Sequence, residues 1–267
     1  MELVQAAQKV LRYEYRLHLS FSAPVGRHCF TLRCTPVSDE RQQLLECSRE
    51  ILPAGPLSSA ADGFGSILLS GQINCPHTCF DAVMRGSVRT GISGGTSGSP
   101  LDGLFRYPTP LTAPDEALRE AALAIPDEPD PLSTASRVME TVWGRMTYCP
   151  GATGVATTAA AAFAAGQGVC QDYTHIMLAL LRLKGIPARY TVGMLIGEGE
   201  THAWAEVLSD GRWHGFDPTN CVRVGTDHIK FSHGRDYTDC QVCRGHIYGA
   251  AAQQQTVSVS VTDTEIS

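Results

Sequence analysis

The stretch GQGVCQDYTHIMLALLRLKGIPARY, residues 166–190, predicts the element around which the fold is built. Gly185 suits the position just after a helix, and Pro187 prevents the helix from continuing. Cys170 stands in the first turn of this helix, where a cysteine that only packs in a core is less expected. The residues at helical spacing give one wide buried face: Val169, Tyr173, Ile176, Met177, Leu180 and Leu181.

Downstream of this helix, three runs have the composition of strands: residues 188–197, 201–209 and 212–219. Asp210-Gly211 joins the last two and is a strong signal for a two-residue hairpin turn. The sequence therefore predicts an antiparallel sheet after the helix.

Upstream of it, three segments favour helices: residues 115–125, 133–148 and 157–165. Ser133 or Thr134 is the expected N-cap of the second. Helices followed by an antiparallel sheet make this half of the chain α+β.

Residues 10–90 alternate between polar and apolar side chains and read as strands, which favours a small β-sandwich or barrel. Residues 91–114 are rich in Gly, Ser, Thr and Pro and predict a loop or linker. We therefore divide the chain into a β-rich domain, residues 1–110, and a second domain, residues 111–267. The alternating tail, residues 256–267, predicts either a last strand or a disordered end.

Composition excludes several classes of partner. The chain has 267 residues, 43% of them hydrophobic, and a net charge of −6. No run of lysine or arginine stands out, so we expect neither nucleic acid nor a membrane as a partner. No apolar run could span a bilayer and the start lacks the pattern of a signal peptide, so we expect a cytoplasmic protein. Most of the ten cysteines should then be reduced and packed.

The hairpin register brings a possible base and its carboxylate together. With Asp210-Gly211 as the turn, His202 lies opposite Thr219, and Asp217 becomes its diagonal neighbour on the same face. A carboxylate beside an imidazole sets its tautomer and stabilises its charged form. A helix N-terminus favours a thiolate, as at Cys170.

Taken singly, Cys170, His202 and Asp217 each have an ordinary structural explanation. Taken together, in this order and with this hairpin geometry, they predict a Cys-His-Asp triad. Such a triad performs acyl transfer through a covalent thioester.

The motifs GVCQDYTHIMLALLRLKGIPARY, THAWAEV and GFDPTN resemble those of the transglutaminase-like superfamily of papain-like cysteine acyltransferases and hydrolases. The resemblance covers about residues 130–248. It implies Cys170 as the nucleophile, His202 as general base and acid, and Asp217 as the orienting carboxylate. It also implies a transglutaminase-core domain with helices packed on an antiparallel sheet.

GRDYTDC, residues 234–240, resembles the closing segment of the bacterial branch, whose members have an N-terminal β domain. PVGRHCFTLRCTP and ADGFGSILL look like parts of that domain. The sequence departs from the bacterial pattern after residue 239, where Cys240, Cys243 and His246 replace valine and prolines. Cys75 and Cys79 form a second close pair, and a zinc site is the alternative. We favour packed cysteines and predict neither a metal nor a cofactor.

The oxyanion hole is less defined. The backbone N–H of Cys170 is the natural donor. Trp143, the only upstream tryptophan, also fits a core position, and Gln167 and Gln171 flank the nucleophile. Trp204 shares a strand face with His202, where it forms either a pocket wall or part of the core.

Four functions remain open. We favour a cysteine hydrolase, a peptidase or amidase, acting on a peptide, a protein or a small amide. A transglutaminase, transferring a glutamine acyl group to an amine, requires the same residues. The third alternative is a binding module without activity, and a weaker one is a redox or metal protein based on Cys240 and Cys243. The sequence leaves the oligomeric state open.

Overall fold

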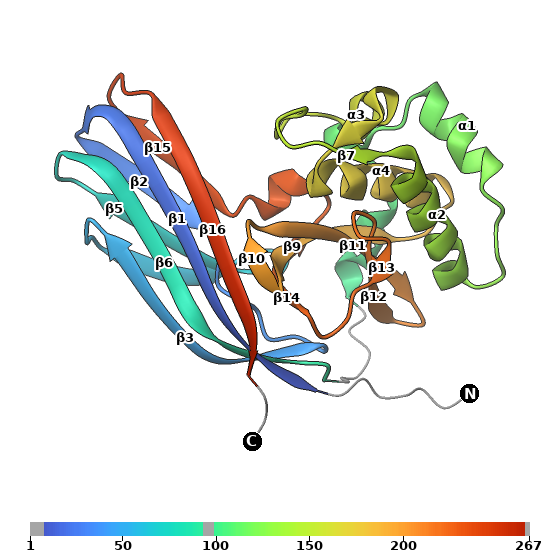
Figure 1. Cartoon of the computed structure of the whole chain (residues 1–267), viewed down its shortest axis with the longest axis horizontal. Helices are drawn as coiled ribbons and strands as arrows, with labels where there is room; N and C mark the ends of the chain where they lie inside the picture. The colour runs from blue at the N-terminus through green and yellow to red at the C-terminus, as the bar shows by residue number, and fades with distance from the viewer. Residues whose placement is uncertain (1–7, 93–98, 265–267) are drawn as a thin grey trace.

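The computed structural model describes residues 8–92 and 99–264, which form a β-sandwich beside a unit of helices packed on a sheet (Figure 1). This confirms the predicted α+β class. The sandwich contains β1 (Lys9–Val25), β2 (Arg27–Leu32), β3 (Gln42–Leu52), β4 (Leu57–Ala61), β5 (Ile67–Ile73), β6 (His77–Thr90), β15 (Cys243–Tyr248) and β16 (Gln253–Thr264).

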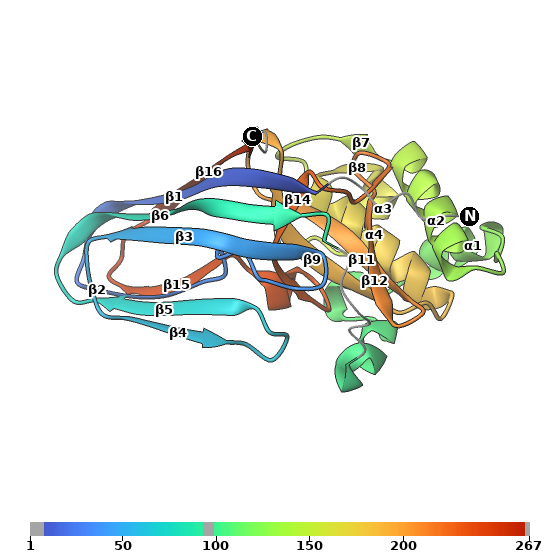
Figure 2. The same cartoon turned by 90° about the horizontal axis from the view of Figure 1, so that it is seen from below.

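The sandwich follows from the alternation in the sequence. β1 buries every second side chain from Leu11 to Phe21, and these residues form the core between the two layers. One sheet has the order β10-β16-β1-β6-β3, where β10 is Gly197–Gly199, and the other has the order β15-β2-β5-β4 (Figure 2). Residues 40–53, which fit either strand or helix by sequence, supply β3.

The chain returns to the sandwich at its C-terminal end. β16 pairs antiparallel with β1 from Phe21↔Gln253 to Val10↔Thr264, and β15 pairs with β2. The alternating tail is thus a strand as far as Thr264, and residues 265–267 lie outside the described residues. The predicted domain boundary between residues 110 and 111 assigns β15 and β16 to the second domain, although both strands pair within the sandwich. The sequence could not show this, because alternation along a strand does not identify the strand's partner.

The second unit has a five-stranded sheet in the order β13-β12-β11-β9-β14, with helices packed on it. Its strands are β9 (Ala188–Leu195), β11 (His202–Ser209), β12 (Arg212–Asp217), β13 (Val222–Arg223) and β14 (His228–Gly234), while β10 (Gly197–Gly199) leaves to join β16. Its helices are α1 (Glu116–Ala124), α2 (Pro131–Arg145), α3 (Ala159–Ala165) and α4 (Cys170–Leu183), and β7 (Thr147–Tyr148) pairs with β8 (Gln167–Gly168).

α4 is the central helix. It packs on β9 and β11 with one side, and on α1, α2 and α3 with the others. It is therefore buried almost all round, more fully than the single stripe predicted from its sequence. Arg182, near its end, donates hydrogen bonds to the carbonyls of Phe105, Ala188 and Arg235, and so anchors the helix to its surroundings.

One local prediction was wrong. α2 begins at Pro131 with Asp130 as its N-cap, not Ser133 or Thr134, because the Asp130 carboxylate accepts two first-turn N–H bonds and proline suits the first helical position. The linker contains two 3₁₀ segments, η1 (Pro100–Arg106) and η2 (Pro110–Thr112), while its residues 93–98 lie outside the described part of the chain.

Polar contacts join the two units. The Gln42 side chain on β3 donates to the Lys230 carbonyl at 2.9 Å and accepts the Lys230 backbone N–H at 2.8 Å. Tyr15 and Phe231 meet edge to face with ring centroids 5.7 Å apart.

No helix among the described residues is both long and apolar enough to cross a bilayer.

Candidate active site

The chain reverses sharply before Cys170. Gly166 ends α3 in the left-handed conformation, at φ +67°, which favours glycine. Gly168 faces Asp172 so closely that a Cβ atom would lie 2.5 Å from a carboxylate oxygen. Val169 is then the N-cap, and Cys170 is the first residue of α4.

Asp172 stabilises this helix start. Its Oδ2 accepts the backbone N–H of Val169 at 2.8 Å and the hydroxyl of Thr153 at 2.6 Å. Burial raises the pKa of the carboxyl, although these two hydrogen bonds act in the opposite direction. The carboxylate therefore closes the first turn and ties it to the loop around Thr153.

His202 and Asp217 lie side by side, as the hairpin register predicts. The ladder pairs Ala205 with Phe216 and Ser209 with Arg212, so Asp210-Gly211 is the two-residue turn. His202 Nε2 is 2.7 Å from Asp217 Oδ2, and the Asp217 side chain is 0% exposed.

Cys170 lines the same cleft as this imidazole and lies near enough to affect its charge. Since Asp217 occupies Nε2, the nitrogen left for the thiol is Nδ1. Burial disfavours a charged imidazole, but interactions with Asp217 and Cys170 together outweigh it and raise the pKa of His202 to about 10. At Asp217 burial is the largest single effect, but the combined interactions with His202, His228 and Asn220 outweigh it and lower the pKa of the carboxyl.

Asn220 and His228 are two neighbours of Asp217 that sequence reasoning missed. Asp217 Oδ1 accepts the N–H groups of Thr219 and Asn220, and Oδ2 accepts the Asn220 amide at 2.7 Å. The Asp-Pro-Thr-Asn order is a signal for such a turn. His228 has no comparable signal, because β14 pairs with β9 and not with the hairpin.

A large cleft opens at this site, between the sandwich and the second unit. Its volume is about 1160 Å³, and its lining includes Cys170, His202 and Gln171. Tyr148 also lines it, and its pKa is raised by burial and by the charges of Cys170 and Glu200. The sandwich contributes Tyr15, Gln255 and Val257.

The four pocket candidates have different positions. Gln171 lines the cleft, where its amide donates to the Val155 carbonyl at 3.1 Å. Trp204 is buried behind His202, with ring centroids 6.4 Å apart, and so packs in the core. Gln167 and Trp143 lie at the surface outside the cleft lining; Trp143, 54% exposed, is not the core aromatic considered from sequence.

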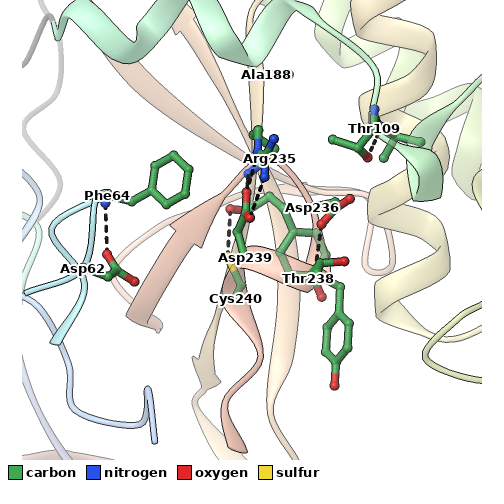
Figure 3. Close-up of polar contacts among 12 residues, drawn as sticks. Asp62, Phe64, Thr109, Ala188, Arg235, Asp236, Thr238, Asp239 and Cys240 are labelled. Atoms are coloured by element: carbon green, nitrogen blue, oxygen red, sulfur yellow. Dashed lines mark hydrogen bonds and ion pairs between the residues drawn. The ribbon is translucent and has the colours of Figure 1, made fainter. Parts of the chain in front are cut away.

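The closing segment, residues 234–240, lies at the edge of the second sheet (Figure 3). The Asp236 carboxylate accepts the Thr238 N–H and so caps η3 (Tyr237–Cys240). Arg235 forms an ion pair with Asp239 at 2.8 Å. The Tyr237 N–H donates to His175 Nε2 at 3.2 Å, which ties the segment to α4.

The cysteines considered for zinc are not gathered together. Cys75 and Cys79 are exposed on the sandwich, Cys240 is buried and Cys243 is half-buried in the cleft lining. Among the described residues, the one group of three or more side chains close enough to hold a metal ion is His202, Asp217 and His228.

Comparison with known families agrees with this architecture. Residues 120–218 match the model of the transglutaminase-like superfamily, and residues 11–89 match that of the bacterial transglutaminase-like N-terminal region. The chain belongs to the transglutaminase-like superfamily. The resemblance inferred from the sequence motifs is therefore confirmed, including the N-terminal β region of the bacterial type.

Chains of similar sequence occur in mycobacteria. The uncharacterized protein ML0607 of Mycobacterium leprae is 29% identical over 264 residues, covering 91% of this chain and 94% of its own. The uncharacterized protein Rv2569c of Mycobacterium tuberculosis is 29% identical over 286 residues, covering 94% and 90%.

A solved structure shares the whole transglutaminase-like architecture. It comes from Cytophaga hutchinsonii and is described as a candidate cysteine protease. The two match with a TM-score of 0.79 at 20% identity, over 98% of this chain and 93% of the other. At this identity the match shows a shared fold, sandwich included.

Proposed function

We propose that this protein is a cysteine hydrolase that cleaves an amide bond with Cys170, His202 and Asp217. The observation that carries the proposal is one shared imidazole. His202 is 2.7 Å from Asp217, and it shares the cleft lining with Cys170, whose charge helps to raise its pKa and which begins a buried helix. The raised pKa of His202 supports an imidazolium at neutral pH, the partner that a thiolate needs.

In the first half of the proposed reaction, the Cys170 thiolate attacks the amide carbonyl and forms a carbon–sulfur bond. The oxyanion lies near the N-terminus of α4, where the first N–H groups have no partner within the helix. The His202 imidazolium then gives its proton to the leaving amine as the carbon–nitrogen bond breaks.

In the second half, neutral His202 takes a proton from water, and the resulting hydroxide attacks the thioester. The carbon–sulfur bond breaks, the acid leaves, and the thiolate–imidazolium pair is restored. Asp217 keeps the imidazole oriented throughout. A cleft of about 1160 Å³ suits a peptide or a protein segment as the substrate, and a small amide also fits.

The name of the Cytophaga hutchinsonii protein supports the hydrolase. Transfer of a glutamine acyl group to an amine is the second candidate, and one observation favours it. The cleft lining includes Glu198 and Glu200 and, among the described residues, neither lysine nor arginine. Such a surface attracts a cationic amine that competes with water for the thioester.

The test needs no knowledge of the substrate. The protein is treated with iodoacetamide near neutral pH, and alkylation of each cysteine is followed over time by mass spectrometry. We expect Cys170 to react faster than Cys149 and Cys221, which are also partly exposed. His202→Ala should slow Cys170 and leave the other two unchanged.

Equal rates at the three cysteines would instead favour a binding module without activity. If Cys170 is selectively alkylated, peptides are screened with and without an added primary amine. Cleaved peptide identifies the hydrolase, and amine-linked peptide identifies the transferase. Cys170→Ala should abolish either product and leave the far-ultraviolet circular dichroism spectrum unchanged.

A further inference from the structure

His228 is a second histidine beside Asp217. It begins β14, and its side chain is 5% exposed. Its Nε2 is 3.5 Å from Asp217 Oδ2, the same oxygen that faces His202 Nε2 at 2.7 Å. Two imidazoles from different strands thus converge on one carboxylate oxygen.

The ring of His228 is otherwise unpartnered. Both of its nitrogens are buried without a hydrogen bond, a state that costs free energy in a folded protein. Its remaining ring contacts are with Trp204, edge to face at 5.3 Å, and with His202 at 6.3 Å. A leucine could fill a slot against an indole, so packing alone gives no reason for an imidazole here.

The distance between His228 Nε2 and Asp217 Oδ2 leaves a hydrogen bond within reach. At 3.5 Å the contact is longer than a formed N–H···O bond, but a shift of about half an ångström would close it. The titratable groups that contact the ring are Asp217 on β12 and His202 on β11. A neutral imidazole that donates to Asp217 would add no charge to compete with His202.

We propose that His228 is a positioning residue, which donates an Nε2–H hydrogen bond to Asp217 and holds the carboxylate in place as His202 changes charge. The proposal rests on the proposed function. When His202 gives its proton to the leaving amine, its attraction for Asp217 weakens. The second imidazole keeps the carboxylate aimed at His202, ready for the proton taken from water.

The test compares three variants of the full-length protein. His228→Leu removes the donor, His228→Gln keeps an N–H donor, and His28→Leu removes a buried histidine from the sandwich as a matched control. For each, the rate of Cys170 alkylation by iodoacetamide is measured across pH, with urea unfolding to confirm the fold.

We expect His228→Leu to fold and to lower the alkylation rate about tenfold, the equivalent of one pKa unit at His202. The rise of the rate with pH should shift toward higher pH, because a less stable imidazolium supports the thiolate less well. His228→Gln should recover most of the rate, and His28→Leu should match the wild type.

Two results would overturn the proposal. One is a folded His228→Leu variant with the wild-type rate and pH profile. The other is a metal-dependent site, shown by loss of the Cys170 pH profile on adding EDTA and its return with Zn²⁺. If wild-type Cys170 is not selectively alkylated at all, it is the proposed function that fails.

Discussion

Asp217 is the most constrained side chain of the candidate site. It is 0% exposed and accepts hydrogen bonds from His202, Thr219 and Asn220. A buried carboxylate is stable only when such partners replace water. The constraint fixes which nitrogen of His202 faces the thiol, so one residue determines both the charge and the orientation of the base.

Asp217→Asn should therefore affect stability and reactivity together. We expect a loss of about 3 kcal/mol in the free energy of unfolding, since one partner of a buried pair is removed. Turnover should fall about 10³–10⁴-fold, because the His202 tautomer is released. Urea unfolding measures the first effect and peptide turnover the second, and an undiminished rate of Cys170 alkylation would also contradict the assigned role of the carboxylate.

The stability effect should depend on pH in a defined way. The raised pKa of His202, about 10, means that its contribution is complete below its ordinary value near 6.5 and lost as pH rises through about 10. The lowered pKa of Asp217 means that its contribution is present above its ordinary value near 3.8 and lost as pH falls. Wild type and Asp217→Asn should thus differ most between about pH 4 and 6.5.

At the scale of the element, the start of α4 depends on close packing around Asp172. Gly168 leaves room for the carboxylate that caps the helix, and the same turn presents Cys170 to the cleft. A displaced carboxylate would free the Val169 N–H and alter the direction of the first turn. The nucleophile is therefore positioned by residues that do not themselves react.

Gly168→Ala tests this arrangement. Its new Cβ would lie 2.5 Å from the Asp172 carboxylate, so we expect a loss of about 1–3 kcal/mol in the free energy of unfolding and slower Cys170 alkylation. Gly144→Ala is the matched control, because nothing lies within 4 Å of a Cβ built at this α2 position. The control should gain about 0.5–1 kcal/mol, and equal behaviour of the two variants would exclude the packing explanation.

At the scale of the whole molecule, β16 connects the two units. It pairs with β1 along one edge and with β10 of the second unit along the other. Gln255 and Val257 of this strand line the cleft beside Cys170 and His202. The sandwich is thus one wall of the candidate active site.

Val259→Asp should disrupt this connection. Val259 is buried between its partners Tyr15 and Gly199, and an unpaired carboxylate there should cost about 3 kcal/mol of unfolding free energy. Ser258→Asp is the control, because Ser258 is exposed and paired with Arg16. Thermal unfolding measures both, and a Val259→Asp variant as stable as Ser258→Asp would mean that β16 does not hold the units together.

The amino-acid sequence by itself determined the features that depend on nearby residues. Alternation along β1, the helical spacing after Cys170 and the turn at Asp210-Gly211 each act over a few residues. The last of these places His202 beside Asp217 by register alone. The tertiary structure alone decided which distant elements meet: β16 with β1, the sandwich with the cleft, Trp143 with solvent and His228 with Asp217. The physical reason is that strand pairing and packing between distant segments follow from the burial of whole surfaces, which local spacing does not encode.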